Sequence, residues 1–340
     1  MRVLITGAGG FLGRATTAAA LAAGHEVVAL HRPASADTLG AATPGLTRIT
    51  GDLRQRGEWC DQFATVEAVI HCAAAASGDL PTQLAGTVLA TENLLAALPA
   101  GLRRFVHVSS FSVYDFDGPR FLGLLSEDSP LEGRPLRRDA YTQTKLLQER
   151  LVRQYASQHR VPLIVARPGA IYGPGKTWDY GRSFAFGRFD LVFAPLARMR
   201  LIQVDNCADA LVAALSLPID SELTVNLVDA EQPGHWRFHR LARRLGAATG
   251  IGVPVPYALV VALGGAARLA SILFFRSRAR LPELLDPPRQ RARWRPLRYS
   301  RERAQQVLSL GRRVSLEAGT AAMIRSEQAQ HARPTEVGSR

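Results

Sequence analysis

Short apolar runs alternate with longer Ala/Leu-rich stretches through the first half of the chain. The apolar runs span residues 2–6, 26–30, 46–50, 68–72, 104–109 and 162–167. The stretches between them include 13–23, 82–98 and 140–159. Short apolar runs separated by helical segments are typical of βαβ units, whose right-handed crossovers give a parallel sheet covered by helices on both faces. The pattern therefore predicts an α/β fold with a doubly wound parallel sheet.

This rhythm ends after Arg167. Residues 168–195 are rich in Gly, Pro and aromatic side chains, residues 201–217 suggest a short strand and a helix, and 224–228 suggest another strand. The remainder is mostly helical and rich in Arg. We expect this half to supply the substrate-specific residues, and the candidates in its loop are Trp178, Asp179, Tyr180 and Arg182.

A glycine-rich loop follows the first predicted strand. Residues 6–13 read T-G-A-G-G-F-L-G, which fits G-x-x-G-x-x-G through Gly7, Gly10 and Gly13. Glycines permit a tight turn and a close backbone approach, and the N–H groups at the start of the next helix attract phosphates. Between a strand and a helix, this loop predicts a dinucleotide-binding site.

The end of the second strand bears on the choice of dinucleotide. An Asp or Glu here would bind a ribose 2′-hydroxyl, whereas an Arg accommodates a 2′-phosphate. In this chain Leu30 is followed by His31 and Arg32, and the first acidic residue is Asp37. NADP is therefore favoured over NAD, and we interpret His31 as an ordinary residue at the end of the strand.

Tyr141 and Lys145 lie four positions apart in a predicted helix. That spacing places both side chains on one face, one turn apart. A free phenol titrates near pH ~10, and a neighbouring cation lowers its pKa towards the range useful for acid–base catalysis. An isolated pair of this kind is also common on exposed helix surfaces.

Four ordered motifs decide between these readings. They are the glycine-rich loop, Gly51-Asp52-Leu53, the segment 109–114 (S-S-F-S-V-Y) and Tyr141-x-x-x-Lys145, and a fifth segment, 167–175 (R-P-G-A-I-Y-G-P-G), accompanies them. Together they resemble the extended short-chain dehydrogenase/reductase family, which includes NAD-dependent epimerase/dehydratases and 3β-hydroxysteroid dehydrogenases. The resemblance covers residues 1 to about 230 and continues more loosely to about 325.

The resemblance implies a role for each matching residue. Tyr141 is the general acid/base, Lys145 holds the nicotinamide ribose and lowers the pKa of the phenol, and Ser110 binds the reacting oxygen. The implied cofactor-binding residues are Gly7, Gly10, Phe11, Leu12, Gly13, Arg32, Asp52, Leu53, Ala73, Ala74, Tyr141, Lys145 and Pro168. No metal site is implied.

Some positions depart from the family pattern. Sugar-nucleotide dehydratases carry an acidic pair where this chain has Phe111 and Ser112, so dehydration is disfavoured. Thr87 stands where an Asn is common. In the segment 205–210, we expect Asp205 or Asn206 to cap a helix that begins near residue 208.

The resemblance implies a Rossmann domain over 1–170, joined by strand 224–228, an interleaved and mostly helical substrate region over 171–325, and a polar tail over 326–340. The expected reaction is hydride transfer at a secondary alcohol or ketone of a sugar-like or nucleotide-linked substrate, by an epimerase or an oxidoreductase. A reductase or dehydrogenase of a steroid- or lipid-like alcohol is the alternative. A cofactor-sensing protein without turnover is the non-enzymatic alternative.

Composition changes this picture little. The formal net charge is +13, but 40 of the 42 basic residues are Arg, a bias that weakens the meaning of any one Arg and strengthens that of Lys145. No recognition module for nucleic acid accompanies the charge. The three cysteines, Cys60, Cys72 and Cys207, are far apart, which suggests neither disulfides nor zinc and fits a cytoplasmic protein.

Residues 256–275 form an apolar stretch long enough to cross a bilayer. Arg268 interrupts it, and we expect a buried helix or a substrate lid instead. Residues 276–313 contain twelve Arg and three acidic residues, an excess that suits anionic lipid or a substrate diphosphate as well as a solvated surface. Peripheral membrane contact is therefore a further expectation. The resemblance adds another, a homodimer through the helices after strands four and five.

Overall fold

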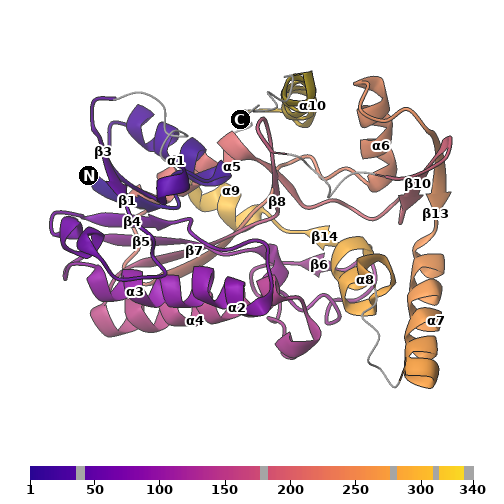
Figure 1. Cartoon of the computed structure of the whole chain (residues 1–340), viewed down its shortest axis with the longest axis horizontal. Helices are drawn as coiled ribbons and strands as arrows, with labels where there is room; N and C mark the ends of the chain where they lie inside the picture. Colours follow the sequence, from indigo (N-terminus) through magenta and orange to yellow (C-terminus); the bar gives the residue numbers. More distant parts are fainter. Residues whose placement is uncertain (36–42, 177–182, 276–281, 309–313, 333–340) are drawn as a thin grey trace, which may run out of the picture.

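The computed structural model describes residues 1–35, 43–176, 183–275, 282–308 and 314–332. Seven parallel strands form the central sheet in the order β12-β7-β5-β4-β1-β2-β3 (Figure 1). Their bounds are β1 (Arg2–Thr6), β2 (Glu26–His31), β3 (Leu46–Thr50), β4 (Ala68–His71), β5 (Arg104–Val108), β7 (Leu163–Pro168) and β12 (Glu222–Leu227). The predicted doubly wound parallel sheet is confirmed.

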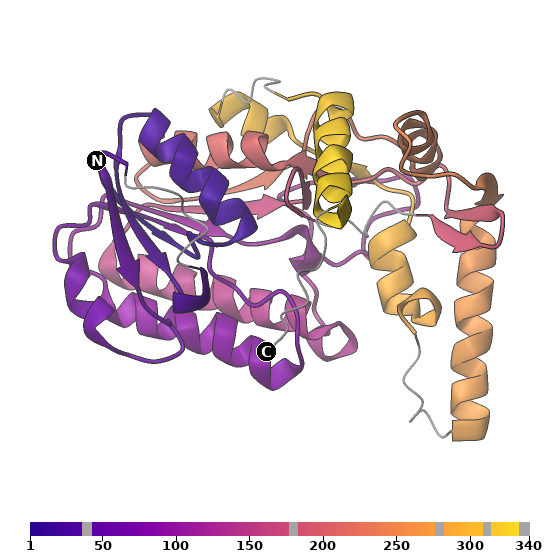
Figure 2. The same cartoon turned by 45° about the horizontal axis from the view of Figure 1, so that its top comes forward.

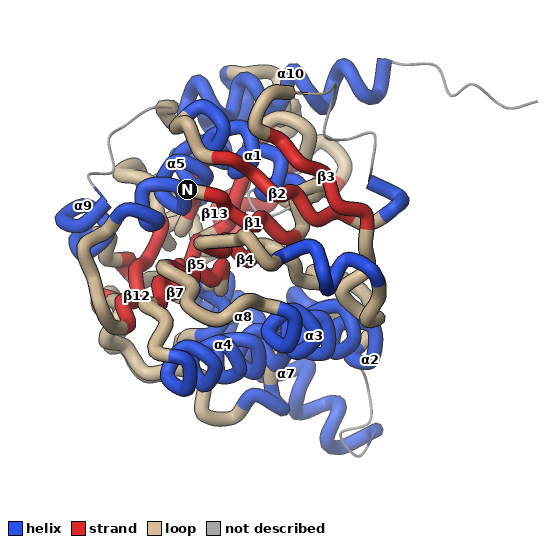
Figure 3. Tube along the Cα trace, turned by 90° about the vertical axis from the view of Figure 1, so that its left-hand side faces the viewer, coloured by secondary structure: helices blue, strands red, loops and turns tan. Residues whose placement is uncertain are grey.

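Helices cover both faces of this sheet (Figure 3). One face carries α1 (Phe11–Ala22), α5 (Val204–Ala213) and α9 (Glu302–Leu308), and the other carries α2 (Leu80–Gln83), η3 (Leu84–Leu89), α3 (Ala90–Ala97) and α4 (Ala140–His159). Alternate strand residues enter the two cores, because successive side chains of a strand point to opposite faces. Val3 and Ile5 pack in the first core, and Leu4 packs in the second.

The second half of the chain adds small elements beside the sheet (Figure 1). Its strands are β8 (Ala170–Tyr172), β9 (Phe184–Phe186), β10 (Phe189–Phe193), β11 (Leu201–Gln203), β13 (Ile251–Val255) and β14 (Arg298–Tyr299), and β14 pairs with β6 (Leu124–Leu125). Its helices are α6 (His235–Arg244), α7 (Tyr257–Phe275), α8 (Pro287–Trp294) and α10 (Leu316–Ala332). Short 3₁₀ turns are η2 (Glu58–Phe63), η4 (Phe111–Val113), η5 (Pro135–Arg137), η6 (Ala214–Ser216) and η7 (Glu283–Leu285).

Two local expectations are wrong. Helix α5 begins at Val204, four residues before the expected start, and its cap is the Gln203 side chain, whose Oε1 accepts from the N–H groups of Asp205 (2.6 Å) and Asn206 (3.1 Å). Asn206 instead donates to Asp229 at 2.8 Å. Of the two forms expected for residues 256–275, the buried helix is wrong, since only 17% of the apolar window of α7 is buried, and the substrate lid stays a prediction.

A buried polar cluster ties α4 to the sheet. The Glu149 carboxylate accepts two hydrogen bonds from Arg167 on β7 (2.9 and 3.0 Å) and one from Arg153 on α4 (2.8 Å). Ser109, just after β5, also donates to Glu149. Burial raises the pKa of Glu149, but Arg167, Ser109 and Arg153 together outweigh that effect and hold the pKa below its usual value. The cluster thus fixes α4 against the ends of two strands.

Replacing Glu149 with Ala is expected to lower the free energy of unfolding by about 3–5 kcal/mol, because Arg167 would remain buried without its partner. Urea denaturation measures this change. Glu222 makes an exposed ion pair with the same Arg153, so Glu222→Ala is the matched control and should cost about 1 kcal/mol or less. Equal losses in the two variants would contradict a special role for the buried cluster.

Candidate functional site

The carboxyl ends of the parallel strands meet along one edge of the sheet. Strand register pairs Thr6 with Leu30 and His71, and His71 with His107. Every predicted site residue follows or ends one of these strands, or lies in the first turns of α1 or α4. They are Gly7, Gly10, Phe11, Leu12 and Gly13 after β1, Arg32 after β2, Asp52 and Leu53 after β3, Ala73 and Ala74 after β4, Ser110 after β5, Tyr141 and Lys145 on α4, and Pro168 ending β7. The order of the strands reverses between β1 and β4, which is where ligands bind in such sheets.

The glycine-rich loop has the shape that a pyrophosphate requires. Gly7 adopts a left-handed backbone (φ +67°), and a Cβ there would lie 3.0 Å from the backbone of Ala73. A Cβ on Gly13 would overlap the carbonyl oxygen of Gly7. Gly10 precedes α1 and has no side chain to cap it, so no side chain at the cap position occupies the N–H groups of the first turn of α1. The loop and the helix start therefore fit the phosphates of a dinucleotide.

Basic side chains flank the expected adenosine end. Asp52 accepts a bidentate interaction from Arg54, with nitrogen–oxygen distances of 2.6 to 3.1 Å. The hydrogen bond with Arg54 lowers the pKa of Asp52, and the nearby charge of Arg32 adds to this effect. Arg32 and Arg54 thus place two guanidinium groups beside one carboxylate. Sequence reasoning identified Arg32 and missed Arg54, whose position two residues after Asp52 was an available signal.

The structure places Ser110 and Tyr141 near each other. Ser110 lies at the start of η4, where its hydroxyl accepts from the N–H of Ser112 (3.1 Å), and its side chain lowers the pKa of the Tyr141 phenol. Tyr141 lies in the first turn of α4, which Asp139 caps by accepting from the N–H of Thr142 (2.9 Å). The cap and the helix start set the position of the phenol beside the serine.

The expected shift in the phenol pKa is wrong in direction. Burial raises the pKa of Tyr141 above its usual value, the hydrogen bond with Ser110 lowers it by less, and the charge of Asp139 raises it further. Among the described residues, these are the groups that act on the phenol, and the Lys145 ammonium is directed elsewhere. At neutral pH Tyr141 is therefore a protonated phenol, which suits a proton donor.

The Lys145 ammonium is buried in a hydrogen-bond network. Its Nζ donates to the carbonyl oxygen of Val108 and to Oε1 of Gln148, both at 2.8 Å. Gln148 in turn donates through Nε2 to the carbonyl oxygen of Ala73 (3.1 Å) and to Thr91 Oγ1 (2.9 Å). Burial lowers the pKa of Lys145 to about 8. Gln148 thus positions the ammonium, and sequence reasoning did not identify it.

A buried histidine completes the network. His71 Nδ1 lies 2.7 Å from Thr6 Oγ1, and its Nε2 lies 3.0 Å from both Thr91 Oγ1 and Gln148 Nε2. Burial lowers the pKa of His71 to about 3, so the ring is neutral and adds no charge beside Lys145. The network joins the ends of β1 and β4 to α4.

Thr87 replaces the Asn that is common in the resembling family, and it makes a definite contact. Its Oγ1 accepts from the N–H of Ala75 at 3.0 Å, and its carbonyl accepts from the Thr91 hydroxyl at 2.6 Å. Thr87 lies in η3, a π-helical turn of the kind often found at functional sites. The threonine therefore holds the loop after β4 in place.

The mouth of the glycine-rich loop carries a cation that sequence reasoning did not assign. Lys176 Nζ lies 5.2 Å from the centre of the Phe11 ring, over the start of α1. The chain contains only two lysines, and this rarity could have singled out Lys176 in the sequence. The loop candidates Trp178, Asp179, Tyr180 and Arg182 lie outside the described residues.

The network generates a prediction for pH dependence. Because the pKa of Lys145 is about 8, its charge is present below pH 8 and is lost above it, so affinity for the dinucleotide should weaken as pH rises through about 8. Gln148→Leu removes an acceptor of the ammonium and should move this midpoint down by roughly one unit or more, since a hydrogen bond to a charged group contributes about 1.5–3 kcal/mol. Fluorescence titration with NADPH across pH measures the midpoint.

Gln154→Leu is the matched control for that experiment, because Gln154 is an exposed residue of the same helix. Its midpoint should equal that of the wild type. A midpoint that does not change in Gln148→Leu would show that the amide does not support the charge of Lys145.

Sequence comparisons identify relatives that match about half of the chain. The chain is 32% identical over 178 residues to a 2-alkyl-3-oxoalkanoate reductase from Stenotrophomonas maltophilia, 52% of each chain. A second relative is a 4-hydroxy-2-methyl-3-oxo-4-farnesyl-3,4-dihydroquinoline-1-oxide ketoreductase from Stigmatella aurantiaca. It is 36% identical over 181 residues, which cover 52% of this chain and 52% of that one. A 3-beta-hydroxysteroid dehydrogenase from Mycolicibacterium neoaurum is 30% identical over 193 residues, 54% of this chain and 51% of that one. The chain thus spans about half the length of these curated relatives.

The fold is shared along almost the whole chain. The crystal structure of UDP-glucuronic acid 4-epimerase from Bacillus cereus in complex with NAD superposes with a TM-score of 0.71 at 19% identity, over 97% of this chain and 100% of that one. The model of the NAD dependent epimerase/dehydratase family matches residues 3–226. With its glycine-rich loop, Ser110, Tyr141 and Lys145 at one edge of the sheet, the chain belongs to the NAD dependent epimerase/dehydratase family.

Proposed function

We propose that this chain transfers hydride between a nicotinamide cofactor and a secondary alcohol or ketone. The observation that supports this most directly is that the Ser110 side chain acts on the Tyr141 phenol, which lies one helical turn from the buried Lys145. When bound, the cofactor supplies or accepts the hydride. In reduction, Tyr141 donates its proton to the carbonyl oxygen as hydride reaches the carbonyl carbon, and the product is the alcohol. The phenol is protonated at neutral pH, so the proton that reduction requires is present.

The proposed substrate is a ketone or alcohol on an apolar, lipid-like molecule. Three relatives of 30–36% identity are named for an alkyl ketoacid, a farnesylated ketone and a steroid, and a fourth, 31% identical, is named for low-salt glycan biosynthesis. The exposed apolar helix α7 in the second half of the chain agrees with a substrate of this kind. Assays with NADPH and a long-chain 3-ketoacid or a 3-ketosteroid test the proposal, and failure to turn over any such ketone would contradict it.

A nucleotide-linked sugar is the second candidate substrate. The UDP-glucuronic acid 4-epimerase shares the fold over 97% of this chain. An epimerase of this kind keeps its cofactor through the catalytic cycle, whereas a reductase exchanges it. Denaturing the purified protein and identifying the released nucleotide separates the two, since stoichiometric NAD would favour the sugar epimerase.

The proposed cofactor is NADP. Arg32 and Arg54 lie beside Asp52 at the expected adenosine end, and guanidinium groups suit a 2′-phosphate through paired hydrogen bonds. The cation Lys176, over Phe11, adds positive charge near the phosphates.

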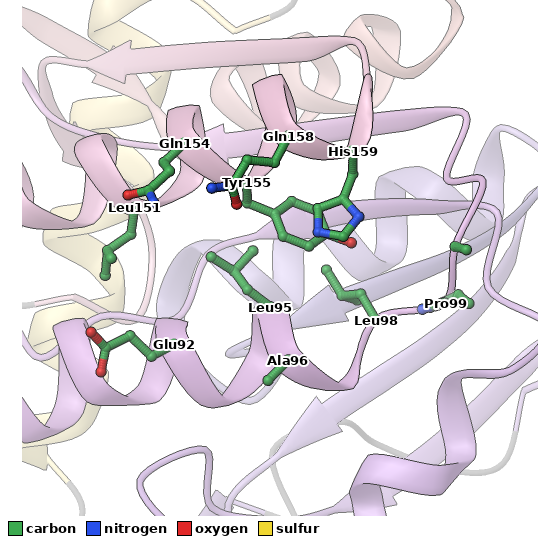
Figure 4. A pocket seen from close by; sticks show the side chains of 11 residues that line it. Glu92, Leu95, Ala96, Leu98, Pro99, Leu151, Gln154, Tyr155, Gln158 and His159 are labelled. Atoms are coloured by element: carbon green, nitrogen blue, oxygen red, sulfur yellow. The ribbon is translucent and has the colours of Figure 1, made fainter.

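The proposed assembly is a cytoplasmic homodimer formed through α3 and α4. These helices border a surface groove of about 450 Å³, lined by Leu95, Leu98, Leu151 and Tyr155 among others (Figure 4). The groove lies at the far end of α4 from Tyr141, so a second copy would leave the site open.

The three cysteines, all within the described residues, are free thiols, which suits a reducing compartment. A monomeric mass in light scattering, or recovery from an oxidising compartment on cell fractionation, would contradict this assembly.

Tyr141→Phe should lower turnover by roughly 10²- to 10⁴-fold, because the phenol proton is lost while the ring remains. Affinity for NADPH should stay within about twofold of the wild type, since the phenol is proposed to act on the substrate oxygen. Steady-state kinetics and fluorescence titration give the two values. Unchanged behaviour in every assay would favour a cofactor-sensing protein.

Arg32→Ala should weaken NADPH binding by roughly 10- to 100-fold and leave NADH binding unchanged, because a charge-assisted hydrogen bond contributes about 1.5–3 kcal/mol. Isothermal titration calorimetry with both nucleotides measures the difference. Arg56→Ala is the matched control, because Arg56 is an exposed arginine two residues after Arg54. Equal losses for NADPH and NADH would contradict recognition of the 2′-phosphate by Arg32.

A further inference from the structure

Helix α7 is the most apolar surface element in the described part of the chain. An 18-residue window, Tyr257–Phe274, has a mean hydropathy of 1.8, and only 17% of it is buried. The helix runs along the outer edge of the molecule, beyond α8 and away from the central sheet (Figures 1 and 2). A helix with this composition would ordinarily lie in a core.

One narrow stripe attaches α7 to the rest of the protein. Val260 is buried, and a Cβ on Gly264 would overlap the side-chain oxygen of Gln290 on α8. Gln290 donates through Nε2 to the carbonyl oxygens of Val260 (2.9 Å) and Leu284 (2.6 Å). The attachment is therefore specific, and small residues allow the two helices to approach closely.

The remaining sides of α7 expose large apolar side chains. They include Leu259, Val261, Leu263, Leu269, Ile272, Leu273 and Phe274, with Leu273 at 66% and Phe274 at 78% exposure. A helix that is apolar on all sides is found in the core of a protein or in a membrane. Since the protein itself covers only one stripe, the second environment fits α7.

A lipid bilayer suits this surface better than a second protein chain does. A protein partner would cover one face, whereas the exposed residues lie on every side except the stripe that meets α8. Eighteen helical residues extend about 27 Å, close to the ~30 Å hydrocarbon thickness of a bilayer. The single charge within the window, Arg268, is exposed, and its charge lowers the pKa of Asp286, which precedes α8.

The charge of the chain favours anionic lipid. Residues 276–313 carry twelve Arg and three acidic residues, and the whole chain has a formal net charge of +13. Some of these arginines form partly exposed ion pairs, for example Arg291 with Asp117 and Arg303 with Asp128. The net positive charge of this segment attracts anionic headgroups that lie within about one Debye length of it.

We propose that α7 docks this protein onto an anionic lipid bilayer by inserting its exposed apolar sides into the membrane. The attachment through Gln290 keeps the catalytic domain at the membrane surface. This proposal stands independently of the proposed enzymatic function, because it depends on the surface of α7 and not on Ser110, Tyr141 or Lys145.

The full-length protein is tested by flotation with vesicles of phosphatidylcholine alone and of phosphatidylcholine with phosphatidylglycerol. The wild type should float with both and should bind the anionic vesicles more tightly, with the difference reduced by salt. The double variant Leu273→Ser/Phe274→Ser should bind at least about tenfold more weakly, since it lacks two apolar side chains that are proposed to insert into the membrane.

Leu136→Ser/Leu196→Ser is the matched control, because these leucines are 88% and 84% exposed and lie outside α7. It should float like the wild type. NADPH titration and thermal melting should be unchanged in both double variants, which separates lost docking from lost folding or cofactor binding.

The proposal is overturned if the wild type floats with neither kind of vesicle. It is equally overturned if the α7 variant floats to the same extent as the wild type. It is also overturned if light scattering shows a dimer that the α7 variant abolishes while vesicles have no effect, since a second copy then covers the helix.

Discussion

The arrangement of the site depends on one buried carboxylate. Glu149 accepts hydrogen bonds from Arg167, Arg153 and Ser109, and so joins the long helix α4 to the ends of β5 and β7. A buried charge is tolerated only when its hydrogen-bonding capacity is filled, which restricts the position of every group around it. Tyr141 and Lys145 lie on the same helix, and Ser110 adjoins Ser109. The carboxylate therefore holds the helix that carries Tyr141 and Lys145 against the strand that leads to Ser110.

Burial also controls the chemistry of the two ionisable groups beside it. Desolvation disfavours the charged form of each, so it raises the pKa of the Tyr141 phenol and lowers that of the Lys145 ammonium to about 8. The network through Gln148 and the neutral His71 supplies the ammonium with acceptors and adds no opposing charge. The site therefore holds a proton on the phenol and a cation near the ribose position.

The second half of the chain joins the sheet to a surface of different character. Arginines there brace loops, as Arg295 does by donating to the carbonyl oxygens of Phe116 (2.9 Å) and Pro119 (2.7 Å). Helix α7 packs through small residues on one side and exposes apolar side chains on the others. The proposed docking of α7 on lipid agrees with relatives named for apolar ketones and alcohols.

The sequence by itself determined the sheet, the glycine-rich loop and the place of Ser110, Tyr141 and Lys145, because strand periodicity and local spacing fix which residues follow each strand. Helix α4 spans residues 140–159 as its pattern predicted. Only the tertiary structure decided the direction of the phenol pKa, the role of Gln148, the Gln203 cap of α5 and the exposure of α7. Each of these depends on desolvation or on contacts between residues far apart in the chain, and an apolar stretch has the same composition whether protein or lipid surrounds it.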